Sequence, residues 1–173
     1  TSFTVTDNSA PVIVSCAAAQ SAFAGADCQA TVPDFTASVN ATDNCTASSS
    51  LVISQSPAAG TLAGTGVTSV TITVADASGN SANCNTSFTV TDNTAPVIVS
   101  CAAAQSAFAD ASCQATVPDF TASVNATDNC TATASLVISQ SPAAGTLAGT
   151  GVTPVTITVA DASGNSATCN TSF

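Results

Sequence analysis

The chain contains no lysine, arginine or histidine, although it is 173 residues long. Its ten acidic residues are therefore not balanced by any basic side chain, and the formal net charge is −10 at pH 7. Such a surface repels phosphate groups and anionic lipid headgroups, because it has no side chain that could neutralise them. The sequence therefore argues against nucleic acid and against anionic membrane surfaces as partners.

Most of the usual catalytic side chains are also missing. Besides the basic residues, the sequence lacks glutamate and tyrosine, so only aspartate, serine and threonine remain if the cysteines are paired. Catalysis needs a base, a nucleophile and a group that stabilises developing charge. The sequence therefore predicts a protein that is not an enzyme.

Long apolar runs and a leader segment are absent as well. No apolar run approaches the length that a membrane-spanning helix needs, and no signal peptide opens the chain. We therefore predict no membrane insertion. A mature extracellular fragment has this composition.

What the sequence does contain is one segment written twice. Thr1–Phe88 returns as Thr86–Phe173, an offset of 85 residues. A unit of this length fits a small independent domain, whereas solenoid repeats are shorter. We predict the last strand of a preceding repeat at 1–6, a first repeat at 7–91 and a second repeat at 92–173 whose last strand is truncated. The copies differ at Ser9/Thr94, Gly25/Asp110, Asp27/Ser112, Ser48/Thr133, Ser49/Ala134, Ser69/Pro154 and Asn83/Thr168.

The two ends of the chain are related. The opening string TSFTVTDN is the same as Thr86–Asn93, which closes one repeat and begins the next, and the final NTSF stops inside that segment. One interpretation is a window on a longer array. Another is strand donation, in which Ser2–Thr6 of one chain completes the sheet of its neighbour. A third is an arbitrary cut. In each of the first two cases, the predicted partner is a further copy of the repeat itself.

Each repeat has the pattern of short β-strands separated by turns. In SVTITVAD, the alternation places Val70, Ile72 and Val74 on one face, and NTSFTVT places Phe88 and Val90 on one face. Turn-rich strings such as DASGN and SPAAGTLAGTGV separate the strands. About seven strands per repeat without helical periodicity predict an all-β fold of two tandem immunoglobulin-like antiparallel β-sandwich domains joined end to end.

Cysteine is abundant, and it falls as four residues per repeat. An even number at fixed spacing in a small β-rich domain predicts a disulfide framework and an oxidising compartment, outside the cell or at its surface. Zinc is disfavoured, because the chain has no histidine and no C-x₂-C pair. The cysteines are Cys16, Cys28, Cys45, Cys84, Cys101, Cys113, Cys130 and Cys169.

Several motifs, taken in order, resemble the hyalin repeat (HYR) domain. They are TDN-x-AP-VI-x-x-C, C-x-A-x-V, ATDNC and VTITVADASGNSA-x-C, followed by a return to FTVTDN, and they cover both repeats. The resemblance implies an immunoglobulin-like extracellular repeat of the kind found in tandem arrays of adhesion-related and cell-surface proteins. One departure is Ala17, with Ala102 in the second repeat, where the family would have proline after the first cysteine.

The sandwich topology suggests how the cysteines pair. If APVIVSC and CQATV are the first two strands, Cys16 and Cys28 flank the loop between them at one end of the sandwich. Cys45 and Cys84 then fall at the opposite end. We therefore predict Cys16–Cys28 with Cys45–Cys84, repeated as Cys101–Cys113 with Cys130–Cys169.

Aspartate and asparagine gather at one end of the predicted sandwich. Carboxylates brought together without a basic residue repel one another unless a cation joins them, and hard oxygen ligands suit Ca²⁺. The alternative is ordinary turn chemistry, in which these side chains bond to their own backbone. We expect calcium to rigidify each junction between repeats. The predicted ligands are Asp7, Asn8, Asp43, Asn44, Asp76 and Asn80, with Asp92, Asn93, Asp128, Asn129, Asp161 and Asn165 in the second repeat.

The function predicted from these features is a structural repeat of an extracellular filament or stalk, stapled by disulfides and stiffened by calcium. The alternative is a cell-surface adhesin module that binds a protein or a carbohydrate. Adhesion would favour an exposed aromatic residue or a loop specific to one repeat, and the seven differences between the copies supply neither. Asn40 and Asn125, each in an N-x-T sequon, are the candidate glycosylation sites.

Overall fold

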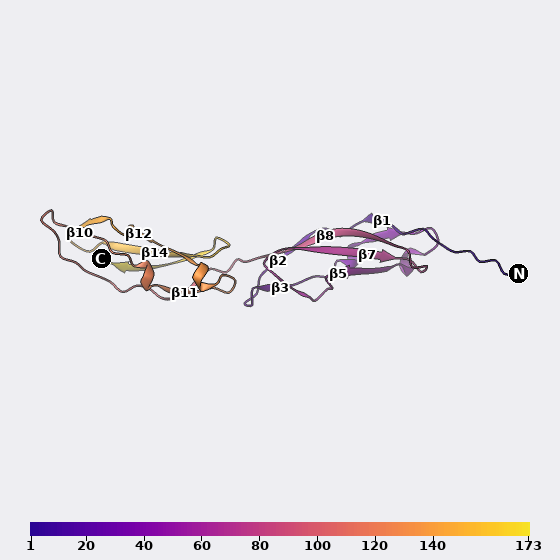
Figure 1. Cartoon of the computed structure of the whole chain (residues 1–173), viewed down its shortest axis with the longest axis horizontal. Helices are drawn as coiled ribbons and strands as arrows, with labels where there is room; N and C mark the ends of the chain where they lie inside the picture. The colour runs from indigo at the N-terminus through magenta and orange to yellow at the C-terminus, as the bar shows by residue number, and fades with distance from the viewer. The chain divides into compact units, whose positions relative to one another are not determined.

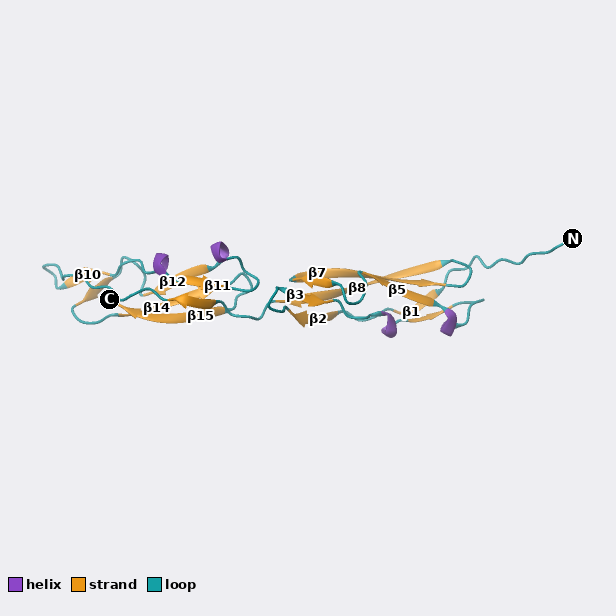
Figure 2. Cartoon of the chain, turned by 90° about the horizontal axis from the view of Figure 1, so that it is seen from below, coloured by secondary structure: helices purple, strands orange, loops and turns teal.

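The computed structural model describes residues 1–173, which divide into two compact units. Unit 1 is Thr1–Thr91 and unit 2 is Asp92–Phe173. Both units are built from β-strands and short 3₁₀ turns (Figures 1 and 2). No helix in the chain has the length and hydrophobicity required to cross a membrane.

Unit 1 is organised around a four-stranded sheet in the order β2-β8-β7-β5, in which β2 runs parallel to β8 and the other pairs are antiparallel. The remaining strands form the antiparallel pairs β1–β4 and β3–β6. The strands are β1 Val12–Ser15, β2 Gln20–Phe23, β3 Gln29–Thr31, β4 Asn40–Thr42, β5 Val52–Ser56, β6 Leu62–Gly64, β7 Gly66–Ala75 and β8 Ser81–Thr91, with 3₁₀ turns η1 Thr36–Ser38 and η2 Ser48–Ser50.

Unit 2 repeats this plan with one strand fewer. Its main sheet has the order β12-β14-β15, and the short pairs are β9–β11 and β10–β13. Nothing in it corresponds to β2, although the sequence is nearly the same. The strands are β9 Val97–Ser100, β10 Gln114–Thr116, β11 Asn125–Thr127, β12 Val137–Ser141, β13 Leu147–Gly149, β14 Pro154–Ala160 and β15 Ser166–Ser172, with η3 Thr121–Ser123 and η4 Thr133–Ser135.

The core of each unit follows from strand alternation. Val70, Ile72 and Val74 on β7 are fully buried, and so are their counterparts on β14. Facing this sheet in unit 1 are residues from the β3–β6 side, among them Val32 and Phe35, which pack in the same cluster. The predicted inward face of the SVTITVAD strand and the all-β immunoglobulin-like fold are therefore confirmed.

The predicted disulfide pairing is wrong. Cys16 is bonded to Cys84, and Cys101 is bonded to Cys169, each with a Cα–Cα distance of 6.1 Å. The prediction placed Cys84 at the start of the last strand, but it is the fourth residue of β8. Because β1 is only four residues long, its end lies level with the middle of β8, and the Cys16 Sγ atom is 3.8 Å from the Asn85 carbonyl oxygen. Cys16 therefore meets Cys84 rather than a residue at either end of the unit.

The segment after Cys16 explains the rest of the error. It was expected to be a loop that returns directly to Cys28. Instead it forms β2, which adds to β8 in parallel over the register Gln20↔Phe88 to Phe23↔Thr91 and leads the chain away from Cys16. Cys45 and Cys113 are free thiols, both exposed.

Candidate metal centre

Three aspartates from distant parts of the sequence meet at one end of unit 1, here called the acidic end. Asp7 comes from the segment before β1, Asp43 from the loop after β4 and Asp76 from the turn after β7. Their carboxylate oxygens lie within 4.8 Å of one another. Because β7 ends and β8 begins beside this point, the β7–β8 turn is what fixes the third carboxylate.

Backbone amides orient the first two carboxylates and leave one oxygen of each unused. The Ser9 N–H donates to Asp7 Oδ1 at 3.0 Å, and the N–H groups of Cys45 and Thr46 donate to Asp43 Oδ2 at 2.9 and 2.8 Å. The second oxygens, Asp7 Oδ2 and Asp43 Oδ1, are buried and have no hydrogen-bond partner. Buried polar atoms are nearly always hydrogen-bonded in proteins, so two orphaned carboxylate oxygens at one point are unusual, and both are free to accept a ligand.

The third carboxylate is held by its own turn. Asp76 Oδ1 accepts hydrogen bonds from the N–H groups of Ser78 and Asn80, at 2.9 and 2.8 Å, and Asp76 Oδ2 accepts one from the Asn80 amide at 2.7 Å. Burial alone would raise the pKa of Asp76. The hydrogen bonds from Asn80, Ser78 and Gly79 outweigh this effect together and hold the pKa below its usual value. Asp76 is therefore ionised at neutral pH and available as an anionic ligand.

Two further contacts tie the three segments together. The Asn80 amide also donates to the Asp7 carbonyl oxygen at 3.2 Å, which links the β7–β8 turn to the segment before β1. Buried Thr46 accepts a hydrogen bond on its hydroxyl oxygen from the Ala77 N–H at 3.3 Å, which links the Asp43 loop to the same turn. The convergence of the carboxylates is thus built into the loops.

Unit 2 repeats the arrangement with Asp92, Asp128 and Asp161, whose carboxylate oxygens again lie within 4.8 Å of one another. Asp92 is only 4 % exposed, and Asp92 Oδ2 and Asp128 Oδ1 are buried without a partner. Burial raises the pKa of Asp161, and hydrogen bonds from Asn165, Ser163 and Gly164 lower it further than burial raises it, so the net shift is downward. Because the two units have nearly the same sequence, the same loops bring the same three aspartates together in both.

The asparagines of the predicted ligand set have other positions. Asn80 and Asn165 point their amide nitrogens at the carboxylates, so they clamp the cluster and do not offer it an oxygen. Asn8 and Asn93 are exposed. The amides of Asn44 and Asn129 donate to the Sγ atoms of Cys45 and Cys130, at 3.2 and 3.4 Å. Of each predicted set, the structure brings the three aspartates together.

A free thiol lies beside the cluster in unit 1, which the sequence reasoning missed by assigning Cys45 to a disulfide. Desolvation raises the pKa of Cys45, and the negative charges of Asp7, Asp43 and Asp76 raise it further. The pKa of this thiol therefore depends on the charge of the cluster. The predicted glycosylation sites are elsewhere, since Asn40 and Asn125 are exposed at the first positions of β4 and β11.

Comparison with known proteins gives one clear match. The HYR domain family matches the chain twice, over residues 6–92 and 91–172. No curated protein sequence matches it.

Similar solved structures are the protocadherin gamma C5 EC1-3 fragment (14 % identity, TM-score 0.48, 95 % of this chain and 68 % of that one) and Drosophila N-cadherin EC1-4 (14 %, 0.45, 95 % and 49 %). Mouse cadherin-23 EC22-24 is a third (12 %, 0.48, 94 % and 65 %). The chain spans about half to two thirds of the length of these structures, and likeness at this level carries no argument about function.

Proposed function

The chain belongs to the HYR domain family, and from this premise we propose that it is a structural repeat of an extracellular filament or stalk, with calcium bound at the acidic end of each unit. The observation that carries the proposal is the convergence of three carboxylates, with buried and unpartnered oxygens, in a chain that has no basic side chain. The family match and the disulfide in each unit support an extracellular location.

The donor set fits calcium better than the other common ions. Calcium takes six to eight oxygen ligands in flexible geometry, and carboxylates, backbone carbonyls and water all serve. The cluster offers only oxygen atoms of aspartate, whereas zinc sites are built from cysteine and histidine. Asp7, Asp43 and Asp76 would hold the ion in unit 1, and Asp92, Asp128 and Asp161 would hold it in unit 2. The bound charge would replace mutual repulsion by attraction.

The position of Asp92 in the chain is the reason to expect stiffening. It directly follows Thr91, the last residue of β8 in unit 1, and is itself the first residue of unit 2. An ion that holds Asp92 to Asp128 and Asp161 would fasten the connecting backbone to unit 2 at its first residue. No spare residues would then remain as a flexible linker.

A structural function agrees with the near identity of the units. A binding site for another protein or a carbohydrate usually depends on a few large side chains. The seven positions that differ between the units carry only small or polar residues and one proline. Neither unit therefore has large side chains that the other lacks and that could form a binding site specific to it. The partners in this proposal are further copies of the same unit.

Calcium titration of the whole chain by isothermal calorimetry tests the proposal. We expect two ions to bind, and Asp43→Asn and Asp128→Asn to remove one each. Asp34→Asn is the matched control, because Asp34 is an exposed aspartate outside the cluster and its loss should leave both ions bound. No calcium uptake at millimolar concentration would refute the proposal.

The stiffening is tested separately by comparing Asp92→Asn with Asp7→Asn. Both variants lose one ligand, but only Asp92 lies at the connection between the two units. Interdomain distance distributions from fluorescence energy transfer should broaden for Asp92→Asn, and for the wild type in EDTA, but not for Asp7→Asn. Equal broadening in both variants would mean that the ion does not act through the junction.

A further inference from the structure

The edge strand β5 differs from the other strand edges of unit 1. It ends the main sheet, and all five of its residues, Val52–Ser56, pair with β7 in an unbroken antiparallel register. No strand pairs with its other side. By contrast, the register of β1 shifts between Ile13 and Ser15, and β3 and β6 have only three residues each. Among these edges, β5 therefore presents the longest regular row of unpaired backbone groups.

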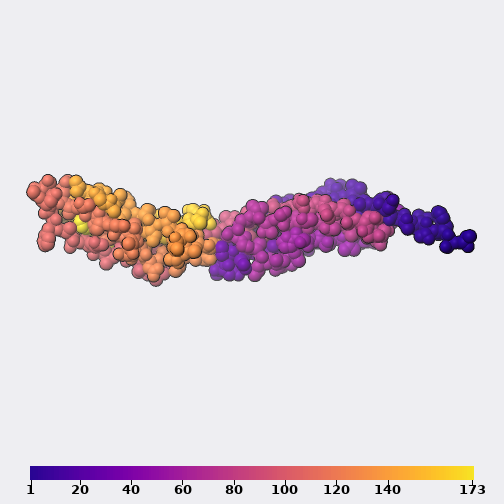
Figure 3. Space-filling model, viewed as in Figure 1, coloured from indigo at the N-terminus to yellow at the C-terminus, as the bar shows by residue number.

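The edge of β5 lacks the features that usually protect such a strand. Natural proteins block exposed edges with charged side chains, prolines or bulges. The sequence of β5 is VISQS, which contains neither a charged residue nor a proline. Val52 is 64 % exposed, and Ser54 and Ser56 are exposed as well. In the space-filling view of Figure 3, the purple-to-magenta part of the chain, which includes β5, lies at the surface of unit 1.

A side-chain clamp fixes β5 in its extended form. The Phe35 N–H donates to Gln55 Oε1 at 2.7 Å. Gln55 Nε2 donates to the carbonyl oxygens of Pro33 and Pro57, at 3.0 and 3.1 Å. A strand that is already held extended loses little conformational entropy when a second strand pairs with it. The edge is therefore preorganised for pairing.

Unit 2 presents the same edge. Its strand β12, Val137–Ser141, ends the sheet β12-β14-β15, has the same sequence VISQS and pairs with β14 in the equivalent register. The Gln140 side chain makes the same three hydrogen bonds, at 2.8, 3.0 and 3.1 Å. Each unit therefore contributes one uncharged edge strand of five residues.

The distribution of charge indicates which partner fits these edges. All ten aspartates lie outside the strands, and the chain has no basic residue that could attract the carboxylates of another copy. Two copies therefore repel one another where their loops meet, and they approach with the least repulsion along an uncharged strand. An antiparallel pair of identical strands has two-fold symmetry, so one surface serves both copies. A cationic partner, by contrast, would find no carboxylate on β5 or β12.

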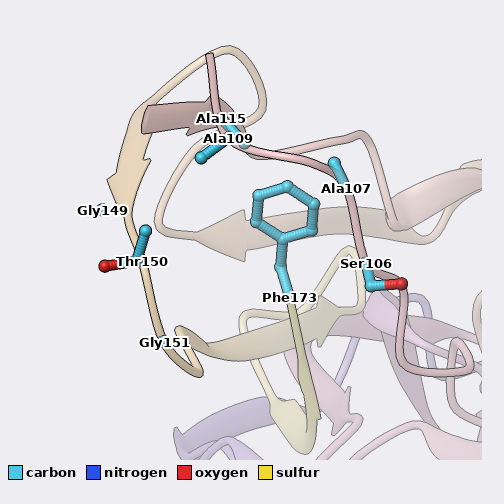
Figure 4. Close-up of a pocket in the computed structure, with 8 residues that line it drawn as sticks. All are labelled: Ser106, Ala107, Ala109, Ala115, Gly149, Thr150, Gly151 and Phe173. Carbon is cyan, nitrogen blue, oxygen red and sulfur yellow. The ribbon is translucent and has the colours of Figure 1, made fainter. Parts of the chain in front are cut away.

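A pocket of about 190 Å³ in unit 2 fits a partner less well. The Phe173 ring points into it (Figure 4). The only polar side chains that line it are those of Ser106 and Thr150, and its other lining residues are alanines and glycines. The pocket therefore offers few groups that would select a ligand, whereas an edge strand offers a row of backbone donors and acceptors.

We propose that β5 and β12 are lateral contacts between copies of this chain, in which each edge strand pairs antiparallel with a VISQS strand of a second copy. When all five residues of two β5 strands pair, Ser54 lies opposite Ser54 of the second copy, and the two main sheets become one continuous sheet. The contact is small, so the association is weak and depends on concentration. It is stronger at high salt, because screening reduces the repulsion between two chains that each carry a charge of −10. This lateral contact goes beyond the proposed end-to-end array and does not require calcium.

Sedimentation velocity of the 173-residue chain, in EDTA and with the free thiols alkylated, tests the proposal. Self-association should increase with protein concentration, and also when NaCl is raised from about 0.15 M to about 1 M. The double variant Ser54→Asp/Ser139→Asp should weaken it at least tenfold, because like charges directly opposite each other destabilise a strand pair. Thr73→Asp/Thr158→Asp is the matched control, since these threonines lie directly beside the two serines, but on the interior strands β7 and β14. The control should associate like the wild type.

Hydrogen exchange of the wild type locates the contact without any substitution. The amides of β5 and β12 that point away from the neighbouring strand should become protected as the concentration rises, whereas the β1 amides should not change. A monomeric wild type at millimolar concentration in high salt, unchanged association of the serine variant, or an equal loss in the threonine control would each overturn the proposal. Because these measurements are made in EDTA, a failed calcium titration would leave the proposal standing.

Discussion

Units 1 and 2 have almost the same sequence, yet the main sheet of unit 1 includes the parallel strand β2, whereas the main sheet of unit 2 has no such strand. The core cluster of unit 1 includes Ala63, Phe88 and Val90. In unit 2 the counterparts Ala148 and Phe173 are only partly buried. The sheet of a unit is thus completed by the few residues that lead into the next acidic end. The stability of unit 1 therefore depends on the residues at its boundary with unit 2 as well as on those in its interior.

The acidic ends show the opposite relation, since they are nearly alike in both units. The same three aspartates and the same clamping asparagine recur, although Asp7 follows a free segment and Asp92 follows a strand. The difference is in burial, because Asp92 is buried and Asp7 is partly exposed. The local turns therefore suffice to bring the carboxylates together in both units.

The largest expected effect comes from removing the phenylalanine ring in or next to the last strand of each unit, Phe88 in β8 and Phe173 after β15. Phe88→Ala should lower the free energy of unfolding of unit 1 by about 3–5 kcal/mol, the usual cost for a buried phenylalanine. Phe173→Ala should cost unit 2 clearly less, because its ring is only partly buried. Native-state hydrogen exchange of β7 and β14 amides in the whole chain measures both. Equal losses would mean that the two rings are equally buried in solution.

Removing a disulfide should affect the two units alike. Replacing Cys16 and Cys84 by alanine should cost unit 1 about 2–4 kcal/mol, as expected for a bridge that closes a long loop. The equivalent change at Cys101 and Cys169 should cost unit 2 the same, since both bridges have a sequence separation of 68. The same exchange measurement reports it, and a much larger loss in unit 2 would show that the bridge contributes more to the unit without a counterpart of β2.

A smaller effect is expected from the aspartate before each 3₁₀ turn. Asp34 Oδ1 accepts hydrogen bonds from the Thr36 hydroxyl at 2.6 Å and the Thr36 N–H at 2.8 Å, and these lower the pKa of Asp34. A carboxyl whose pKa is lower in the folded state stabilises above its unfolded pKa of about 3.9, and this contribution is lost as the pH falls through the folded pKa.

Asp34→Asn should therefore lower the melting temperature at pH 6 and flatten its decline below pH 4. Asp119→Asn should do the same in unit 2, because the turn there has the same hydrogen bonds. Melting curves by circular dichroism between pH 6 and pH 2 measure this effect. An unchanged slope in both variants would assign the acid sensitivity to the carboxylate clusters instead.

The smallest expected change is in thiol chemistry. The pKa of Cys45 is raised by desolvation and by the three aspartates, so Cys45 should react slowly with iodoacetamide at pH 8. Calcium at the cluster would cancel that charge and should speed alkylation of Cys45 a few-fold. Cys113 in unit 2 is the internal control and should keep its rate, as followed by mass spectrometry of the two peptides. A calcium effect of the same size on both would point to a general salt effect.

Sequence reasoning predicted those features that depend on one segment at a time. The alternation in SVTITVAD identified Val70, Ile72 and Val74 as core, because a strand with one buried face must place every second residue inward. Its failures concern where segments meet. The pairing of Cys16 depends on how far β1 runs beside β8, and no local pattern states that length.

The parallel strand β2 was missed for a related reason. Its sequence, QSAF, has no strong alternation, and the same segment in unit 2, which contains Gln105, forms no strand. Whether it pairs depends on residues Thr89–Thr91, which lie far away in the sequence. The acidic cluster could be predicted, because the expected sandwich topology placed three aspartate-containing loops at the same end of each unit. That Asn80 turns its nitrogen toward Asp76 is decided by the turn's backbone and had no signal in the sequence.

The bond between Cys16 and Cys84 also determines how a pulled chain would behave. Load passing along the backbone crosses directly from Cys16 to Cys84 and bypasses the intervening segment, since the two lie 68 residues apart in sequence. At about 3.5 Å per extended residue, that segment would otherwise release on the order of 240 Å of slack. Even if the sheet of one unit opened under tension, the tether would lengthen by only a small fraction of its unfolded contour.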